Sequence, residues 1–164
     1  MNILYLHGLD SKLSSEKREI LEKFGTVLAP DLDYYQNPNA IDSILQMYSE
    51  VEINVVIGSS MGGFAGYHVA NAIFRPALLF NPALIRRSVP QNIPKEKESY
   101  NNLKQIIIGQ RDEVVSPQDT LNFLVGEFNP VTDFYLRLVP RLGHRIPVEL
   151  FEEEVKSFFK KLCY

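Results

Sequence analysis

Short apolar runs alternate along the chain with stretches in which apolar residues recur every three or four positions. The apolar runs have the length of buried strands, and we expect strands at 2–6, 26–29, 53–57, 76–80, 105–108 and 134–139. The longer stretches have the periodicity of amphipathic helices, which we expect at 14–24, 39–50, 61–74, 117–128 and 148–162. Strands and helices are therefore expected to alternate along most of the chain.

This alternation predicts an α/β fold: a mainly parallel sheet of about six strands with helices on both faces. We expect one domain over residues 1–164. The run 134–139 alternates apolar and polar residues, so it is expected at or near an edge of the sheet. The polar, proline-rich segment 81–104, with a charge cluster at 95–98, is too short to build a lid domain with its own core. We therefore expect a shallow, open site at the carboxyl ends of the strands.

A G-x-S-x-G pentapeptide, Gly58-Ser59-Ser60-Met61-Gly62, lies between the third expected strand and the next helix. In that context the pattern is typical of a nucleophile elbow, a sharp turn that holds a serine hydroxyl clear of the sheet. The two glycines suit such a turn because a strained backbone needs neighbours without a Cβ atom. The alternatives are a plain Gly/Ser loop and a phosphate-binding loop, but the spacing matches neither G-x-G-x-x-G nor a Walker A motif. Ser60 is the candidate nucleophile.

A candidate carboxylate, Asp112, and a candidate base, His144, follow two later strands. Together with Ser60 they stand in the order Ser60, Asp112, His144 along the chain. This is the chain order of an α/β-hydrolase triad. A serine hydroxyl is a poor nucleophile at neutral pH, so an imidazole must accept its proton, and a carboxylate must fix the tautomer of that imidazole. Other carboxylates compete with Asp112 for this role: Glu113, Asp31 and Asp33. His144 could also be an ordinary surface histidine.

Two backbone N–H groups are expected to form an oxyanion hole, those of Met61, which follows the nucleophile, and of Leu9 in the loop after the first strand. We interpret His7 as a structural residue that shapes this loop rather than as a proton-transfer group. His68, on the helix after the nucleophile, is interpreted as a packing residue.

Two sets of residues could line the site. The first set is apolar and aromatic, and its members either line an acyl pocket or belong to the core: Tyr34, Tyr35, Leu84 and Ile85. Four arginines either contact an anionic leaving group or are solvated surface: Arg86, Arg87, Arg111 and Arg145. The sequence leaves both questions open.

The composition narrows the function further. A net charge of −3 and an isoelectric point near 5.6 disfavour a nucleic-acid or anionic-membrane partner. We see no signal peptide and no apolar run long enough to span a membrane. The one cysteine, Cys163, cannot form an internal disulfide, and no His/Cys/Asp cluster has metal-ligand spacing. We expect a cytoplasmic protein that binds no metal and acts on a small molecule; its oligomeric state is left open.

The chain resembles the α/β-hydrolase superfamily and, within it, the small lidless YqiA-like esterases. The resemblance covers nearly the whole chain and is carried by the motifs LYLHGLDS, IGSSMGG, GQRDEVV and LGHRI. It implies a serine esterase that cleaves carboxylic ester or thioester acyl groups without a cofactor, through an acyl-enzyme. It also implies that the chain begins at the strand equivalent to the third of the full fold, without the two leading antiparallel strands. The alternative is a catalytically silent binding or scaffold protein with the same fold.

Overall fold

The computed structural model describes residues 1–94, 102–128 and 132–162; the charge cluster at 95–98 and Cys163 lie outside these ranges. Helices and strands alternate in the expected order. They are β1 (Asn2–Leu6), α1 (Ser15–Glu22), β2 (Thr26–Leu28), α2 (Ala40–Met47), β3 (Val55–Ser59), α3 (Met61–Ile73), β4 (Ala77–Phe80), β5 (Lys104–Gly109), α4 (Pro117–Glu127), β6 (Phe134–Val139) and α5 (Val148–Leu162). None of the helices in the described part of the chain is both long and apolar enough to cross a membrane.

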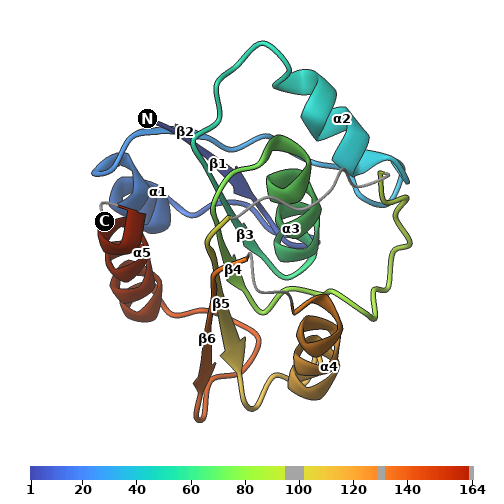
Figure 1. The fold of residues 1–164 in the computed structure, drawn as a ribbon, viewed down its shortest axis with the longest axis vertical. Coiled ribbons are helices and arrows are strands. Elements are labelled where there is room, and N and C mark those ends of the chain that lie inside the picture. The colour runs from blue at the N-terminus through green and yellow to red at the C-terminus, as the bar shows by residue number, and fades with distance from the viewer. Residues whose placement is uncertain (95–101, 129–131, 163–164) are drawn as a thin grey trace.

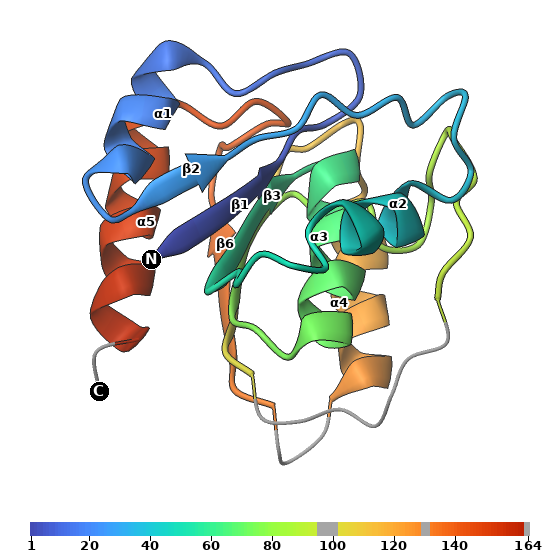
Figure 2. The same ribbon diagram turned by 90° about the horizontal axis from the view of Figure 1, so that it is seen from above.

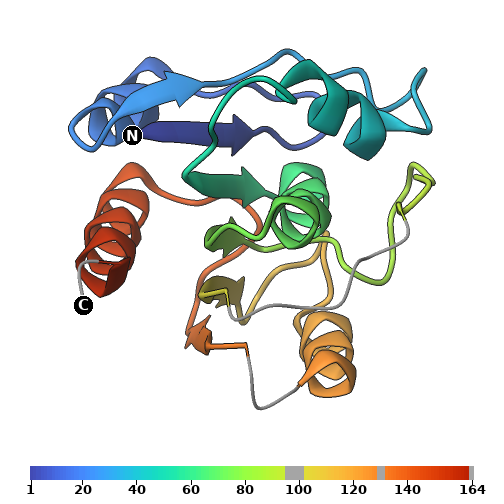
Figure 3. The same cartoon turned by 45° about the horizontal axis from the view of Figure 1, so that its top comes forward.

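The strands form one six-stranded sheet in the order β2-β1-β3-β4-β5-β6, and every neighbouring pair is parallel (Figure 1). The arrows of β1, β2 and β3 point the same way in Figure 3. The register pairs Leu6 with Gly58 and Ser59 with Phe80, so the loops after β1, β3 and β4 leave the sheet at the same edge. The parallel sheet and the place of β6 at its edge confirm the predicted fold class.

Helices cover both faces of the sheet, α1 and α5 on one and α2, α3 and α4 on the other (Figure 2). Because successive side chains of a strand point to opposite faces, neighbouring residues such as Val56 and Ile57 belong to different cores. Ile57 packs in the cluster that contains Phe151 and Phe158 of α5, whereas Val56 packs in the cluster that contains Phe64 of α3. Burial on both faces explains why these strands are continuous apolar runs in the sequence.

Several expected boundaries were wrong by one to three residues, and two of these differences have a clear cause. The third strand runs to Ser59 rather than ending at Ile57, because pairing with β4 continues to the Ser59–Phe80 pair. Helix α2 ends at Met47, before the expected end at residue 50, since Tyr48 leaves the helical conformation with φ −110°. The first difference bears on the site, because the strand leads directly into Ser60.

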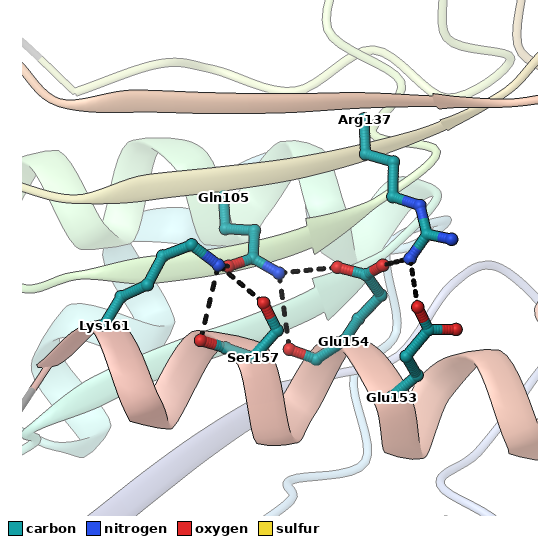
Figure 4. Close-up of polar contacts among 6 residues, drawn as sticks. All are labelled: Gln105, Arg137, Glu153, Glu154, Ser157 and Lys161. Atoms are coloured by element: carbon teal, nitrogen blue, oxygen red, sulfur yellow. Dashed lines mark hydrogen bonds and ion pairs between the residues drawn. The ribbon is translucent and has the colours of Figure 1, made fainter.

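Polar side chains connect α5 to the neighbouring strands of the sheet (Figure 4). The buried Gln105 of β5 donates from Nε2 to the Glu154 carboxylate at 2.6 Å and accepts at Oε1 from Lys161 Nζ at 2.9 Å. Arg137 of β6 binds the carboxylates of Glu153 and Glu154. Helix α5 is therefore tied to both β5 and β6, and these contacts fix the far end of the loop that carries His144.

Candidate active site

Ser60 sits in a strained turn between β3 and α3. Its backbone has φ 57° and ψ −119°, a combination rare for a residue with a side chain, and its N–H donates to Phe80 O at 2.9 Å. The flanking glycines are required by close packing, because a Cβ atom on Gly62 would overlap the carbonyl oxygen of Leu6 and one on Gly58 would overlap that of Gly62. The strand, turn and helix that a nucleophile elbow needs are thus present around Ser60.

Asp112 and His144, from the loops after β5 and β6, are hydrogen-bonded to each other. Asp112 Oδ2 lies 2.8 Å from His144 Nδ1, and Asp112 Oδ1 accepts the backbone N–H groups of Val114 at 2.8 Å and Val115 at 2.9 Å. Burial raises the pKa of the Asp112 carboxyl, but the hydrogen bonds from His144, Val115 and Val114 outweigh it and hold the pKa below its ordinary value. A carboxylate at this position makes Nδ1 the protonated nitrogen of neutral His144, which leaves Nε2 able to accept a proton.

Two of the three carboxylates that competed with Asp112, Asp31 and Asp33, have other contacts. Asp31 Oδ2 accepts from Lys12 Nζ at 2.6 Å, and Asp33 Oδ1 accepts backbone N–H groups of its own turn. Asp112 is the candidate that contacts the His144 ring.

The loop after β1 lies directly against the nucleophile turn. A Cβ atom on Gly8 would stand 3.2 Å from Ser60 Cβ. The backbone N–H groups of Leu9 and Met61 donate to no acceptor within the three described ranges, which leaves them available to a ligand.

His7 supports this loop through both ring nitrogens. Its Nε2 accepts the backbone N–H of Leu32 at 2.9 Å, so Nδ1 carries the proton and donates to Gly8 O at 2.6 Å. The ring is buried, and Tyr34 donates its hydroxyl to His7 O at 3.1 Å. These contacts support the interpretation of His7 as a structural residue. His68 is likewise buried, edge-on to the aromatic rings of its own helix.

Sequence reasoning missed Asn81, which connects the two loops that carry Asp112 and His144. Asn81 is buried at the end of β4 with φ 43°. Its Oδ1 accepts the N–H of Gly109 at 2.7 Å, and its Nδ2 donates to the carbonyl oxygens of Gly143 and His144, both at 3.0 Å. One signal was available in the sequence: an asparagine, which tolerates a positive φ, directly follows a strand at the same sheet edge as the other candidates.

Ser60 and His144 line one cavity of about 810 Å³, which we call the Ser60 cleft; Leu9 and Met61 line it as well. Its apolar lining also includes Ala83, Val114, Val115 and Ile146. The structure favours the second of the two roles considered for Tyr34 and Leu84, a place in the core, and gives none of the four candidate acyl-pocket residues a place in the cleft. Tyr35 and Ile85 are exposed. In the described ranges no group of three His, Cys, Asp or Glu side chains could hold a metal ion.

A protein-family profile matches residues 2–111, which is more than half of the chain; it describes the "Uncharacterised protein family (UPF0227)". The chain belongs to the UPF0227 family. The matched part of this UPF0227 protein contains Ser60 and Asn81 and ends one residue before Asp112. No curated protein sequence matches the chain.

Solved structures show which fold this UPF0227 chain shares. SOBER1 of Arabidopsis thaliana is 16% identical with a TM-score of 0.73, over 100% of this chain and 99% of that one. An α/β-hydrolase enzyme from the metagenome of lagoon sediments of Mar Chica, Morocco, is 15% identical with a TM-score of 0.70, over 100% and 92%. A Bacillus cereus carboxylesterase is 18% identical with a TM-score of 0.62, over 96% and 87%. The UPF0227 chain therefore has the α/β-hydrolase fold, as the sequence motifs predicted.

Proposed function

We propose that this protein is a serine esterase that cleaves carboxylic esters or thioesters through an acyl-enzyme on Ser60. The observation that carries the proposal is the 2.8 Å contact between Asp112 and His144, because His144 lines the same cleft as Ser60, which sits in a strained turn. A buried carboxylate, a half-buried imidazole and a half-buried hydroxyl that follow three separate strands have no evident packing purpose. The likeness of the fold to a carboxylesterase supports the same reaction class.

In the proposed reaction, Ser60 Oγ attacks the acyl carbon while His144 Nε2 takes the hydroxyl proton. The carbonyl electrons move onto oxygen, and the N–H groups of Leu9 and Met61 donate hydrogen bonds to that oxyanion. Removing one such donor typically raises the barrier by about 2.7–4 kcal/mol. When the carbonyl reforms, the bond to the leaving group breaks, and the leaving group takes the proton from His144 and departs as an alcohol or a thiol. The acyl group stays on Ser60.

The second half of the reaction repeats these steps with water. His144 Nε2 takes a proton from a water molecule, whose oxygen attacks the acyl carbon of the acyl-enzyme, and the proton is then returned to Ser60 Oγ. A carboxylic acid is released. Asp112 keeps its negative charge throughout and stabilises the imidazolium that forms twice in each cycle.

The test is hydrolysis of p-nitrophenyl esters of increasing acyl length by the wild type, Ser60→Ala and His144→Ala, together with labelling by a fluorophosphonate. We expect turnover by the wild type, a loss of about 10⁴- to 10⁶-fold in both variants, and labelling that requires Ser60. Labelling without ester turnover would keep the nucleophile but change the substrate class. If the wild type showed no ester turnover and no labelling, the results would favour a non-catalytic binding protein with this fold.

A further inference from the structure

Positive side chains gather in the Ser60 cleft although the whole chain has a net charge of −3. The charged residues that line the cleft are Lys12, Lys17, Arg86, Arg87 and Arg145, with Asp10 as the one carboxylate among the lining residues. A narrow space with low-dielectric walls concentrates the field of such charges. The Ser60 cleft is therefore positive inside an acidic protein.

The cations of the cleft differ in what already neutralises them. Lys12 contacts Asp31 at 2.6 Å, and Arg86 Nε lies 3.1 Å from Asp119 Oδ2. Arg87 has no carboxylate within ion-pair distance in the described part of the chain. No carboxylate of residues 1–94, 102–128 or 132–162 therefore compensates its charge.

Arg87 is also held in a fixed place. Its guanidinium stacks on the ring of Phe64 with 4.0 Å between the carbon Cζ and the ring centroid, and its Nη1 donates to Leu84 O at 2.7 Å. Its Nε is buried and has no hydrogen-bond partner within the described ranges. Burial lowers the pKa of this guanidinium, although Arg stays protonated at neutral pH. A partly desolvated cation without a counter-ion is costly, and an anionic ligand would offset that cost.

The groups that hold Arg87 are the ones that hold the nucleophile. Phe64, on which Arg87 stacks, donates its backbone N–H to Ser60 O at 3.0 Å. Ala83, four residues before Arg87, donates its N–H to the same oxygen at 3.1 Å. A group bound by Arg87 would therefore lie on the wall of the cleft next to Ser60.

Building on the proposed esterase function, we propose that the Ser60 cleft selects esters with a negatively charged group close to the scissile bond. Arg87 is the residue that binds this group, a carboxylate or a phosphate whose oxygens accept guanidinium N–H groups. The exposed Arg145, next to His144, adds to the positive field at the opening. A charge on the acyl part and a charge on the leaving group make the same contact, so both positions are tested.

The experiment compares matched neutral and anionic substrates. For the acyl side, these are p-nitrophenyl valerate and mono-p-nitrophenyl glutarate, which exchange a terminal methyl for a carboxylate. For the leaving group, they are 4-methoxyphenyl acetate and 4-acetoxyphenyl phosphate. Each kcat/KM is divided by the rate constant of hydroxide hydrolysis to remove intrinsic reactivity. The variants are Arg87→Gln and, as the matched control, Arg86→Gln, which removes a neighbouring arginine already paired with Asp119.

We expect the wild type to prefer the anionic member of at least one pair by about 10- to 100-fold, the range of a charge-assisted hydrogen bond. Arg87→Gln should abolish the preference because KM rises much more for the anionic ester than for the neutral ester, and Arg86→Gln should keep the preference. The pair that shows the preference identifies the charged part of the substrate.

Two results would overturn the inference while leaving the esterase intact. One is equal use of neutral and anionic esters by the wild type. The other is an equal loss on both esters in Arg87→Gln, which would mean that Arg87 only supports the turn at Leu84. If the wild type hydrolysed neither member of either pair and the fluorophosphonate did not label it, the esterase proposal itself would fail, and this inference with it.

Discussion

The side chain of Asn81 holds the backbone of His144: its Nδ2 lies 3.0 Å from the His144 carbonyl oxygen. The same amide accepts the N–H of Gly109, three residues before Asp112. One buried side chain thus connects the ends of β4 and β5 with the loop after β6, and we infer that Asn81 is a positioning residue for the Asp112–His144 pair.

Asn81→Gly should therefore lower kcat with little change in KM. Glycine adopts the φ of 43° without strain, so this variant removes the side-chain contacts alone. A displacement of about 1 Å in a reacting group can cost about 100-fold in rate, and we expect a loss of about 10- to 100-fold. Asn81→Asp should lose activity as well, because a carboxylate can accept from Gly109 but cannot donate to the His144 carbonyl.

Gln91→Ala is the matched control for Asn81→Gly. Gln91 is also a buried amide with three backbone contacts, to the N–H of Ala40 and to the carbonyl oxygens of Tyr34 and Asn37. It should lose a similar amount of stability in urea unfolding while kcat stays near the wild-type value. A comparable fall of kcat in the Gln91 variant would make the effect at Asn81 one of general stability.

Asp112→Asn should change how stability depends on pH. Burial raises the pKa of the Asp112 carboxyl, but hydrogen bonds from His144, Val115 and Val114 outweigh it and the pKa is lowered. Such a group stabilises the folded state above its unfolded pKa of about 3.9, and this stabilisation is lost as the pH falls through the folded pKa. The difference in unfolding free energy between wild type and Asp112→Asn should shrink below about pH 4. Urea titrations from neutral to acid pH measure it, and a difference that grew in acid would contradict the ionised Asp112.

Gly62→Ala and Gly126→Ala should have opposite effects on stability. A methyl group on Gly62 would overlap the carbonyl oxygens of Leu6 and His7, which are backbone atoms of the neighbouring strand end and cannot give way cheaply. We expect a loss of about 1–3 kcal/mol or more in the free energy of unfolding. A methyl group on Gly126, in helix α4, meets no atom within 4 Å, so alanine there should add about 0.5–1 kcal/mol. Denaturant unfolding of both variants checks the contrast, and equal losses would exclude the close approach at Gly62.

Glu154→Ala should destabilise the protein more than Glu153→Ala, although both carboxylates bind Arg137. The Glu154 side chain is 4% exposed and also accepts from Gln105 at 2.6 Å, so its removal leaves the buried Gln105 Nε2 with only the longer contact to the backbone carbonyl of residue 154 at 3.3 Å. That costs about 1–3 kcal/mol. The Glu153 side chain is 59% exposed, and an exposed ion pair contributes about 0–1 kcal/mol. Thermal unfolding of the two variants should show the larger decrease in Tm for Glu154→Ala; the reverse order would place the main anchor of α5 elsewhere.

The sequence by itself was sufficient for the fold and for the elbow around Ser60. Strands buried on both faces must be apolar, and helices that cover them must be amphipathic, so both leave a local periodic pattern. The glycines two positions either side of Ser60 are also visible as a local motif, although the contact that requires a glycine at position 62 is with Leu6 and His7.

The tertiary structure decided which groups meet around that turn. Several carboxylates follow strands in this chain, and only strand order and register bring Asp112, rather than Asp31, to His144. The contacts of Asn81 with Gly109 and His144, and of Arg87 with Phe64, also join segments distant in sequence. Such contacts depend on long-range pairing and leave no periodic signal. The proposed role of Asn81 therefore emerged from the folded chain alone, and the sequence, which offered four arginines as possible anion contacts, could not single out Arg87.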